Sequence, residues 1–229
     1  MKVTSAKPIK TFTTRNIKTM LFSSWRTSRI SKRTTIFYLL CIVFLGTPFV
    51  SAVTVEVFKK LRKYHVVPDV INLPPTSVMT VRYPNHVIVQ IGDLLKVDQV
   101  VAKPFIFWPA KRNGLYTLIM TDADYPTPLA RNRSEFLHWM VININGTQFR
   151  VPNGDVKVEY LPPIVNSTAG YHRYVFTAFR QIGREMIDDF PNLSTLHLAE
   201  RADFNTLAFV KKHQYGYPLA VNFYQVEFK

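Results

Sequence analysis

Three apolar runs of this sequence, LYTLIMTD, FLHWMVINI and YHRYVFTAF, each carry a titratable or hydroxylic side chain near one end. Successive side chains of a β-strand alternate between its two faces. This alternation places Asp122 on the apolar face of the first run. It places His138 on the same face as Met140, Ile142 and Ile144 in the second run. In the third run, His172 and Tyr174 share the apolar face. Polar groups buried together are costly unless they bond to one another or to a ligand. The three runs therefore predict a small polar pocket at one rim of a sheet.

Several chemistries use these residue types, and the residues alone leave them open. A metal site could draw on Asp122, Asp124, His138 and His172, although the histidines form no tight ligand pair such as HxH or HExxH. Ser134 stands four residues before His138, but no G-x-S-x-G frame surrounds it as in a hydrolase. Nucleotide binding lacks its G-x-x-x-x-G-K-[ST] loop. A neutral anion pocket remains, in which imidazole N–H, phenol O–H and backbone N–H groups hold a phosphate.

The elements that must position these side chains are mostly short strands. VEVFKKLRKY has the apolar spacing of an amphipathic helix of about ten residues, and the prolines of VVPDVINLPP exclude helix after it. ADFNTLAFVKKH predicts a second helix near the C-terminus, with cations at its end. Strands are predicted from period-two alternation in the runs VMTVRY, VIVQI, FIFW, LYTLIM, FLHWMVINI, RYVFTAF and LAVNFYQVEF.

The charge of the chain is concentrated in its N-terminal tail. The 229 residues carry a net charge of +14, but residues 1–34 hold nine basic and no acidic side chains, whereas residues 53–229 hold twenty basic and fifteen acidic ones. The remaining +5 on a chain of this size does not favour nucleic-acid binding. The length suits one domain with a sizeable core.

An uncharged apolar run, IFYLLCIVFLGTPFV, follows the basic tail at residues 36–50. A bilayer-spanning helix needs about 20 apolar residues, so this run fits the apolar core of a secretory signal better, with cleavage before Val53. The expected organisation is a basic tail at 1–35, a signal peptide or signal anchor at 36–52 and one domain at 53–229. A type II membrane anchor and a mitochondrial presequence are the alternatives to secretion.

Four acceptor patterns for N-glycosylation also favour the secretory route. They lie at Asn132, Asn145, Asn166 and Asn192. The only cysteine, Cys41, lies inside the apolar run, so a mature chain beginning at Val53 could form no disulfide bond.

The segments TLIMTDADYP, LHWMVINING and LPPIVNSTAGYHRYVFTAFRQ resemble, in order and spacing, the two signature regions of the phosphatidylethanolamine-binding proteins. The family pattern is D-P-D-x-P, then a strand with a histidine, then P-P…G-x-H-R-Y. The resemblance covers roughly residues 57–228. It implies a mostly β fold, in which a large central antiparallel sheet packs on a smaller sheet, with short flanking helices including one near the C-terminus.

The resemblance also implies a function and a site. Members of the family bind phosphate-bearing head groups or similar anions and are generally not enzymes, so we expect a monomeric, secreted carrier without cofactor or metal. The alternative is a protein that inhibits a protease or kinase partner. Membrane association is expected only through residues 36–52 or through bound lipid. Carried over by position, the ligand-binding residues are Asp122, Pro126, Phe136 at the mouth, His138, His172 and Tyr174.

Some residues of the motif depart from the family pattern. Ala123 replaces the first proline, Tyr125 is bulky where a small residue is usual, and Leu161 stands where glycine tends to precede the prolines. Two further expectations concern this turn. The bond before Pro126 is expected to be cis, and Asp124, on the opposite parity from Asp122, is expected to bind backbone N–H groups of its own turn.

Overall fold

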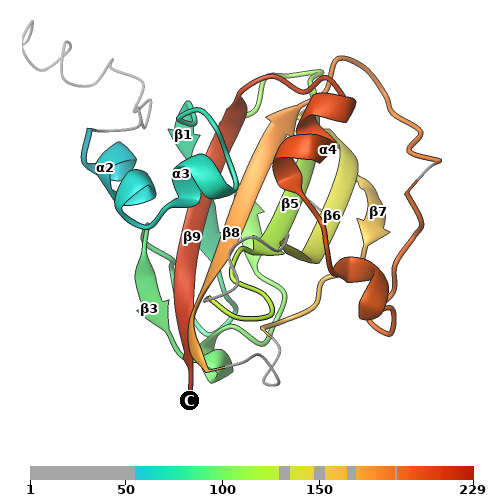
Figure 1. Ribbon diagram of the computed structural model, residues 1–229. Helices are drawn as coiled ribbons and strands as arrows, with labels where there is room; N and C mark the ends of the chain where they lie inside the picture. The colour runs from blue at the N-terminus through green and yellow to red at the C-terminus, as the bar shows by residue number, and fades with distance from the viewer. Residues whose placement is uncertain (1–54, 129–134, 147–152, 164–168, 189) are drawn as a thin grey trace, which may run out of the picture. The chain divides into compact units, whose positions relative to one another are not determined.

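The computed structural model describes residues 55–128, 135–146, 153–163, 169–188 and 190–229 (Figure 1). The chain divides into two units, residues 1–49 and 50–229, and every described residue belongs to the second. The expected tail and apolar segment, and the acceptor sites Asn132 and Asn166, lie outside the described residues. Within the described residues, no helix is long and apolar enough to cross a membrane.

The described elements are short helices and strands of very unequal length. In chain order they are α2 (Val55–Lys63), α3 (Val66–Asp69), β1 (Ser77–Val78), β2 (Thr80–Arg82), β3 (Asp93–Leu95), η1 (Val97–Gln99), β4 (Phe105–Phe107), β5 (Leu115–Asp122), β6 (Phe136–Asn145), β7 (Asp155–Val158), β8 (Gly170–Arg180), η3 (Ala199–Arg201), α4 (Thr206–Lys212) and β9 (Pro218–Phe228).

A seven-stranded sheet forms the centre of this unit, in the order β1-β9-β8-β5-β6-β7, with β3 also paired to β9. The four long strands and β7 pair antiparallel. The short strands β1 and β3 both run parallel to β9, so the sheet is mixed at that edge. Strands β2 and β4 form a separate two-stranded antiparallel sheet. The expected fold, a large sheet with a small one and a few short helices, is confirmed, and the parallel edge strands are an addition to it.

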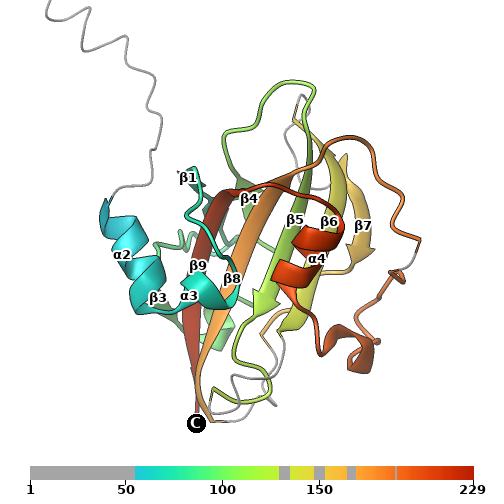
Figure 2. The same ribbon diagram turned by 45° about the horizontal axis from the view of Figure 1, so that its top comes forward.

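Each face of the large sheet buries its own apolar cluster. One face packs against the small sheet through residues such as Val81, Ile106 and Trp108. The other packs beneath α3 and α4, which lie in front of the sheet in Figures 1 and 2, through Val70 and Phe209 among others. Both clusters lie within residues 57–228, which gives this part of the chain a two-sided core of its own.

The segment VIVQI at residues 87–91 is not a strand, contrary to its alternating pattern. Its burial does alternate, since Val89 is buried and Ile88 exposed, but only one bridge forms, between Ile88 and Arg82. The Val89 N–H donates to the carbonyl of Val81 in β2 at 3.0 Å, and the side-chain amide of Asn222 donates to the carbonyl of Val89 at 3.0 Å, so the segment pairs with β2 over too short a length to form a strand. Strand β7 was not predicted, and α3 supplies a short helical turn within the segment for which helix was excluded.

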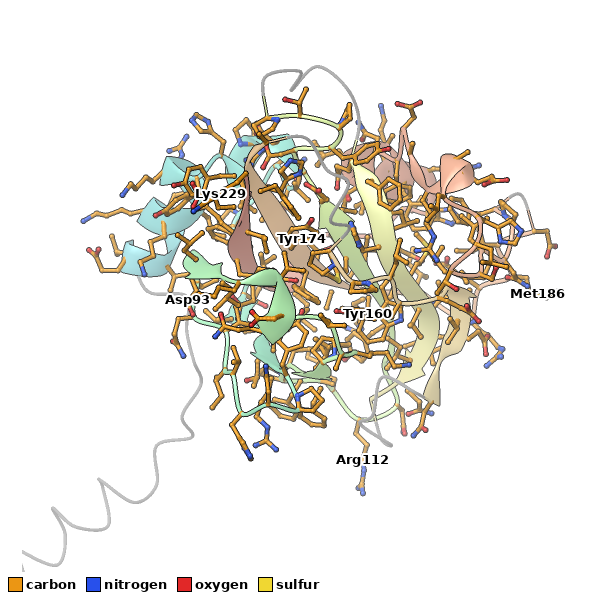
Figure 3. All side chains as sticks on the ribbon, turned by 90° about the horizontal axis from the view of Figure 1, so that it is seen from below. Asp93, Arg112, Tyr160, Tyr174, Met186 and Lys229 are labelled. Atoms are coloured by element: carbon orange, nitrogen blue, oxygen red, sulfur yellow. The ribbon has the colours of Figure 1, made fainter. Side chains whose placement is uncertain are left out.

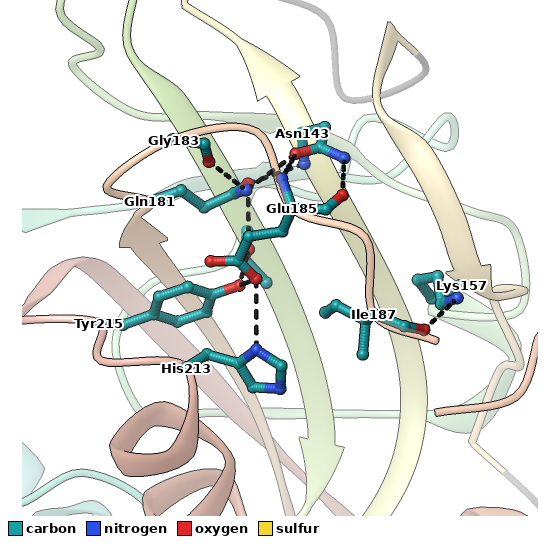
Figure 4. A network of polar contacts seen from close by, with 9 residues as sticks. Asn143, Lys157, Gln181, Gly183, Glu185, Ile187, His213 and Tyr215 are labelled. Atoms are coloured by element: carbon teal, nitrogen blue, oxygen red, sulfur yellow. Dashed lines mark hydrogen bonds and ion pairs between the residues drawn. The ribbon is translucent and has the colours of Figure 1, made fainter. Parts of the chain in front are cut away.

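A buried polar network fixes the loop that follows β8 (Figure 4). Asn143, which adopts a positive φ of 57°, lies at an irregularity of β6 and exchanges side-chain and backbone hydrogen bonds with Gln181 and Glu185. Asparagine tolerates this conformation better than most residues. Tyr215 donates to Glu185 Oε2 at 2.6 Å, and His213 at the end of α4 lies 3.3 Å from the same oxygen. The network ties α4 to this end of the sheet.

Candidate ligand-binding site

Asp122 and His172 form a buried hydrogen-bonded pair at one end of the large sheet. The Asp122 Oδ2 atom lies 2.7 Å from His172 Nδ1, and both side chains are almost fully buried. A carboxylate accepts only, so Nδ1 of His172 carries the hydrogen in this contact. Asp122 Oδ1 accepts the backbone N–H of Asp124 at 2.9 Å, which fixes the carboxylate to the turn that follows β5.

Register brings three of the predicted side chains into one row. Asp122 pairs with Phe136 of β6 on one side and with Tyr174 of β8 on the other. The apolar residues before Asp122 on β5 and after Tyr174 on β8 belong to the cluster under the small sheet, as the alternation predicted. The row therefore lies on the face of the large sheet that is turned toward the small sheet. Figure 3 views this end of the molecule and shows Tyr174 in the middle of it.

His138 lies on the same face, but a β-bulge places it there and not the simple alternation that was predicted. The alternation placed it with Met140 and the residues at every second position beyond, but Met140 and Ile142 belong to the cluster on the opposite face. The pairing shifts between Met120 and Thr121, so that His138 is an extra residue in β6, a β-bulge. Because of the bulge, the His138 ring lies 5.1 Å from both the Phe136 and Tyr174 rings. The predicted residues do lie together. Of the expected face partners of His138, Met140 and Ile142 were wrong, whereas Ile144 belongs to the cluster under the small sheet.

The bulged His138 is fixed by Leu161. Its Nδ1 lies 2.8 Å from the carbonyl oxygen of Leu161, and the Leu161 N–H donates back to the His138 carbonyl at 2.9 Å. Nδ1 therefore carries a hydrogen, and in the neutral ring Nε2 is an acceptor. Burial lowers the pKa of His138 to about 4, and the nearby charge of Asp122 opposes this only in part. His138 is consequently neutral at physiological pH.

Aromatic rings surround these polar groups. Tyr174 stacks on Tyr224 with 5.3 Å between centroids, and the hydroxyl groups of Tyr224 and Tyr83 lie 3.0 Å apart. Phe136, expected at the mouth, is only 1 % exposed because Tyr125 covers it with 4.7 Å between ring centroids. The residue that departs from the family pattern thus takes the outer position that was expected for Phe136. Burial among rings disfavours charge and strengthens any hydrogen bond formed there.

Comparison with known proteins agrees with this geometry. A family model described as phosphatidylethanolamine-binding protein matches residues 89–225, a stretch that contains all the residues named above except Tyr83. The chain belongs to the phosphatidylethanolamine-binding protein family. Members of this family are largely binding or regulatory proteins. The bond between Tyr125 and Pro126 is cis, as the resemblance to the family implied.

Relatives and solved structures of the family span several kingdoms. A 26 kDa secreted antigen of Toxocara canis is 35% identical over 70% of this chain, and the match spans 60% of that antigen. Protein MOTHER of FT and TFL1 homolog 2 of Oryza sativa subsp. japonica is 38% identical over 68% of this chain and 85% of its own length.

Two solved structures share the fold at lower identity. A phosphatidylethanolamine-binding protein from Plasmodium vivax has a TM-score of 0.64 at 18% identity, covering 75% of this chain and 97% of its own. The carboxypeptidase Y inhibitor, solved in complex with its cognate proteinase, has a TM-score of 0.60 at 22% identity and covers 76% and 96%.

Asp124 has a different partner from the expected one. Its carboxylate accepts the backbone N–H and the Nε–H of Arg173 at 2.9 and 2.8 Å, and Nη2–H at 2.9 Å, instead of N–H groups of its own turn. Arg173 Nη1 also lies 3.0 Å from Asp69 of α3 and donates to the carbonyl of Tyr64 at 2.7 Å. Burial alone would lower the pKa of Arg173, but Asp124 and Asp69 outweigh it and raise that pKa.

This ion-paired cluster borders a cavity of about 460 Å³, lined on the helix side by Lys63, Tyr64 and His65. Arg173 and Asp124 are the buried charges of its lining, and they bind each other. The cavity therefore lies behind the row of Asp122 and Tyr174, on the opposite face of the sheet, and its buried charges are already satisfied.

Arg201 is a supporting residue that the sequence gave no reason to single out. It is completely buried in η3, and its guanidinium donates to the carbonyl groups of Leu137, His138, Glu159 and Ser194 at 2.9 to 3.1 Å. Two of these carbonyls belong to the bulged stretch of β6. Burial lowers the pKa of Arg201 to about 10, which leaves it charged at neutral pH. Arg201 therefore holds the backbone that carries the His138 ring.

The remaining predicted residues are placed as follows. Pro126 is partly buried beside Tyr125. Of the two described acceptor asparagines, Asn192 is exposed in the loop before η3, and Asn145 is partly buried where β6 pairs with Leu115. Among the described residues, no group of three or more His, Cys, Asp or Glu side chains is arranged to hold a metal ion. Ser134 lies outside the described residues.

Proposed function

We propose that this protein is a non-enzymatic binding protein that takes up a phosphate-bearing head group, of the phosphatidylethanolamine type, or a small organic anion. Asp122, His138, His172 and Tyr174 hold the polar part of the ligand, and Pro126 and Phe136 line the site. The observation that carries the proposal is the buried contact between Asp122 Oδ2 and His172 Nδ1 at 2.7 Å, on the same face as the neutral His138 ring. Family membership supports it.

The two histidines have different roles beside such a ligand. Asp122 accepts the Nδ1–H of His172 and so fixes the orientation of this ring beside the polar part of the ligand. His138 keeps its Nδ1–H on Leu161 and offers Nε2 as an acceptor to a P–OH or ammonium group of the ligand. Asp122, although acidic, therefore serves an anion site by orienting the His172 ring.

The test is a calorimetric titration of residues 53–229 with phosphorylethanolamine and with a short-chain, water-soluble phosphatidylethanolamine. His138→Ala and Tyr174→Phe are expected to weaken binding at least about tenfold each, because a hydrogen bond to a charged group contributes about 1.5–3 kcal/mol. Tyr217→Phe is the matched control, since Tyr217 is 67 % exposed in the turn before β9, outside this row. The assignment is wrong if both site variants bind as tightly as the parent.

The role in the organism is proposed to be that of a secreted carrier. The relative named as a secreted antigen supports export of this chain. Sequencing the mature N-terminus from a eukaryotic host should give Val53 first, and intact Asn-linked glycans would show that the route is secretory.

The solved inhibitor complex supports a second possibility, a protein that inhibits a protease. In that case purified protein inhibits carboxypeptidase-type enzymes with undiminished potency in the His138→Ala variant. If the His138→Ala variant instead loses both inhibition and head-group binding, the two activities use the same site.

A further inference from the structure

The small sheet presents large apolar side chains on its outer face. Val81 and Ile106 face inward and are buried, whereas Phe105 and Phe107 face outward and are 53 % and 44 % exposed. Ile88, bridged to Arg82, is 53 % exposed beside them. Register places Phe105 opposite Arg82 and Phe107 opposite Thr80, so these side chains form one continuous surface, called the Phe105 face below.

This surface departs from the usual pattern of a sheet with one buried side. The outward positions of such a sheet are normally polar, because the inward positions already supply the apolar contacts. Two phenylalanines at i and i+2 of a strand point to the same side. Exposed apolar groups that gather in this way mark a surface that binds something.

The charge on the two strands of the Phe105 face and their flanks is net positive, although Asp93, Asp98 and Lys96 follow in the connecting residues 93–98 and Glu159 lines one cavity with Lys103. Residues 80–92 and 99–121, which include both strands of the small sheet and their flanks, contain Arg82, Lys103, Lys111 and Arg112 and no Asp or Glu. In Figure 3, Arg112 projects outward from the edge of the molecule. Lys103 is exposed and lies over the Trp139 ring at 5.6 Å, close to the start of β4.

The loop after β8 provides a useful contrast. Ile182 and Met186 are more exposed, at 82 % and 83 %, yet residues 181–190 carry one basic and three acidic side chains. The basic one, Arg184, is paired with Asp155 at 2.9 Å. Met186 lies well away from Arg112 in Figure 3. Exposed apolar residues occur in both places, but of the two only the Phe105 face combines them with a net positive charge on its own strands and flanks.

We propose that the Phe105 face docks the protein onto the surface of a bilayer that contains anionic lipid. Phenylalanine rings insert readily into the interface between head groups and acyl chains, and Lys and Arg beside them are attracted to anionic head groups. The absence of acidic residues from both segments favours a negatively charged partner. This association is separate from the ligand site and from the apolar run at residues 36–50, which were the expected routes to a membrane.

The test measures co-sedimentation of residues 53–229 with vesicles, because this part of the chain holds both core clusters and omits the apolar run. Vesicles are made from phosphatidylcholine alone or from phosphatidylcholine with phosphatidylserine, and contain no phosphatidylethanolamine. The parent protein is expected to partition at least about tenfold more strongly onto the anionic vesicles, and added salt should reduce this difference.

Paired variants separate the apolar and the charged parts of the surface. Phe105→Ser with Phe107→Ser should reduce partitioning at least tenfold on anionic vesicles, by analogy with the cost of removing buried apolar groups. Arg82→Gln, Lys111→Gln and Arg112→Gln together should remove most of the dependence on phosphatidylserine and on salt. Ile182→Ser with Met186→Ser is the matched control and should partition like the parent. A cooperative thermal transition for each variant checks that it is folded.

Three results would overturn the proposal. The first is equal partitioning of the Phe105→Ser, Phe107→Ser variant and the parent, and the second is no preference of the parent for anionic vesicles. The third is a parent that sediments as a dimer while this variant sediments as a monomer, because the Phe105 face would then bind a second copy. Failure of head-group binding in the titration above would leave all three readouts unaffected.

Discussion

The turn after β5 and the start of β8 supply two neighbouring pairs of residues that behave in opposite ways on the two faces of one sheet. Asp122 and His172 face the small sheet and form a single hydrogen bond among aromatic rings. Asp124 and Arg173, one or two positions further along, face the helices and form a multiple ion pair that also includes Asp69. The first face holds the residues of the proposed ligand site, and the second holds charges that satisfy one another.

The difference indicates that the two pairs of the family motif have different roles. Every oxygen of Asp124 is used by Arg173, and the guanidinium reaches a helix and a backbone carbonyl, so this pair joins β8, the turn and α3. Asp122 fixes a histidine and the turn. Changes on the helix face should therefore affect stability first, and changes on the pocket face should affect binding first.

Among the changes on the two faces, removing Arg173 is expected to have the largest effect on the free energy of unfolding. Arg173→Met should lower the free energy of unfolding by about 3–5 kcal/mol, because it leaves the buried Asp124 carboxylate without its partner. Urea denaturation at neutral pH measures this. The matched change on the pocket face, Asp122→Asn, should cost only about 1–2 kcal/mol, the range for a buried hydrogen bond. Arg173→Met with Asp124→Leu should recover part of the loss, and equal losses in the two single variants would contradict the division of roles.

The pH dependence of the free energy of unfolding tests the burial of two further titratable residues, His138 and Glu135. Burial lowers the pKa of His138 to about 4 and raises the pKa of Glu135, which accepts from Thr206 N and Oγ1, to about 7. The stability that neutral His138 contributes is full above pH 6.5, its unfolded value, and is lost as pH falls toward 4. The stability contributed by protonated Glu135 is full below pH 4.5 and is lost as pH rises through 7.

As pH rises, the stability contributed by His138 increases and that contributed by Glu135 decreases, over nearly the same pH range. Each contribution is worth about 3 kcal/mol. Urea unfolding from about pH 4 to about pH 8 should show that Glu135→Gln gains stability relative to the parent as pH rises. The advantage of the parent over His138→Gln should grow in the same direction. The comparison of variant with parent at each pH removes the effect of the other titrating groups. Two differences that stay constant with pH would show that neither group has a shifted pKa.

The long elements of this fold could be predicted from local patterns. Strands β5, β6, β8 and β9 are long enough for alternation to be unambiguous, and the helical spacing before Tyr64 and after Phe204 predicted α2 and α4. The short β3 and β7 carry too few residues for a pattern. The segment at 87–91 has a strand-like pattern, but it pairs with β2 through a single bridge, and the Val89 carbonyl accepts from a side chain more than a hundred residues away, which no local pattern reveals.

The residues predicted for the site do lie near one another, but two features of their arrangement depend on tertiary contacts. Alternation assumes an unbroken register, so it could not detect the bulge that turns His138 toward Tyr174. Parity separated Asp122 from Asp124 correctly, but the partner of Asp124 lies 49 residues along the chain on a neighbouring strand. Arg201, which holds the bulged backbone, lies 63 residues beyond His138 and has no signal of its own.

Tyr125 offers the smallest and most specific change on the pocket face. Its ring covers Phe136, so Tyr125→Ala should cost about 0.5–1.5 kcal/mol of stability for one aromatic pair, in addition to the apolar burial that this partly exposed ring loses. The same change uncovers Phe136 beside the row of polar groups, and we expect it to admit a bulkier head group. The ratio of affinities for phosphorylcholine and phosphorylethanolamine should therefore rise severalfold in this variant, as measured by calorimetry. Tyr217→Ala removes an exposed tyrosine elsewhere and should leave the ratio unchanged. An unchanged ratio in Tyr125→Ala would mean that the departure from the family pattern at this position does not select the ligand.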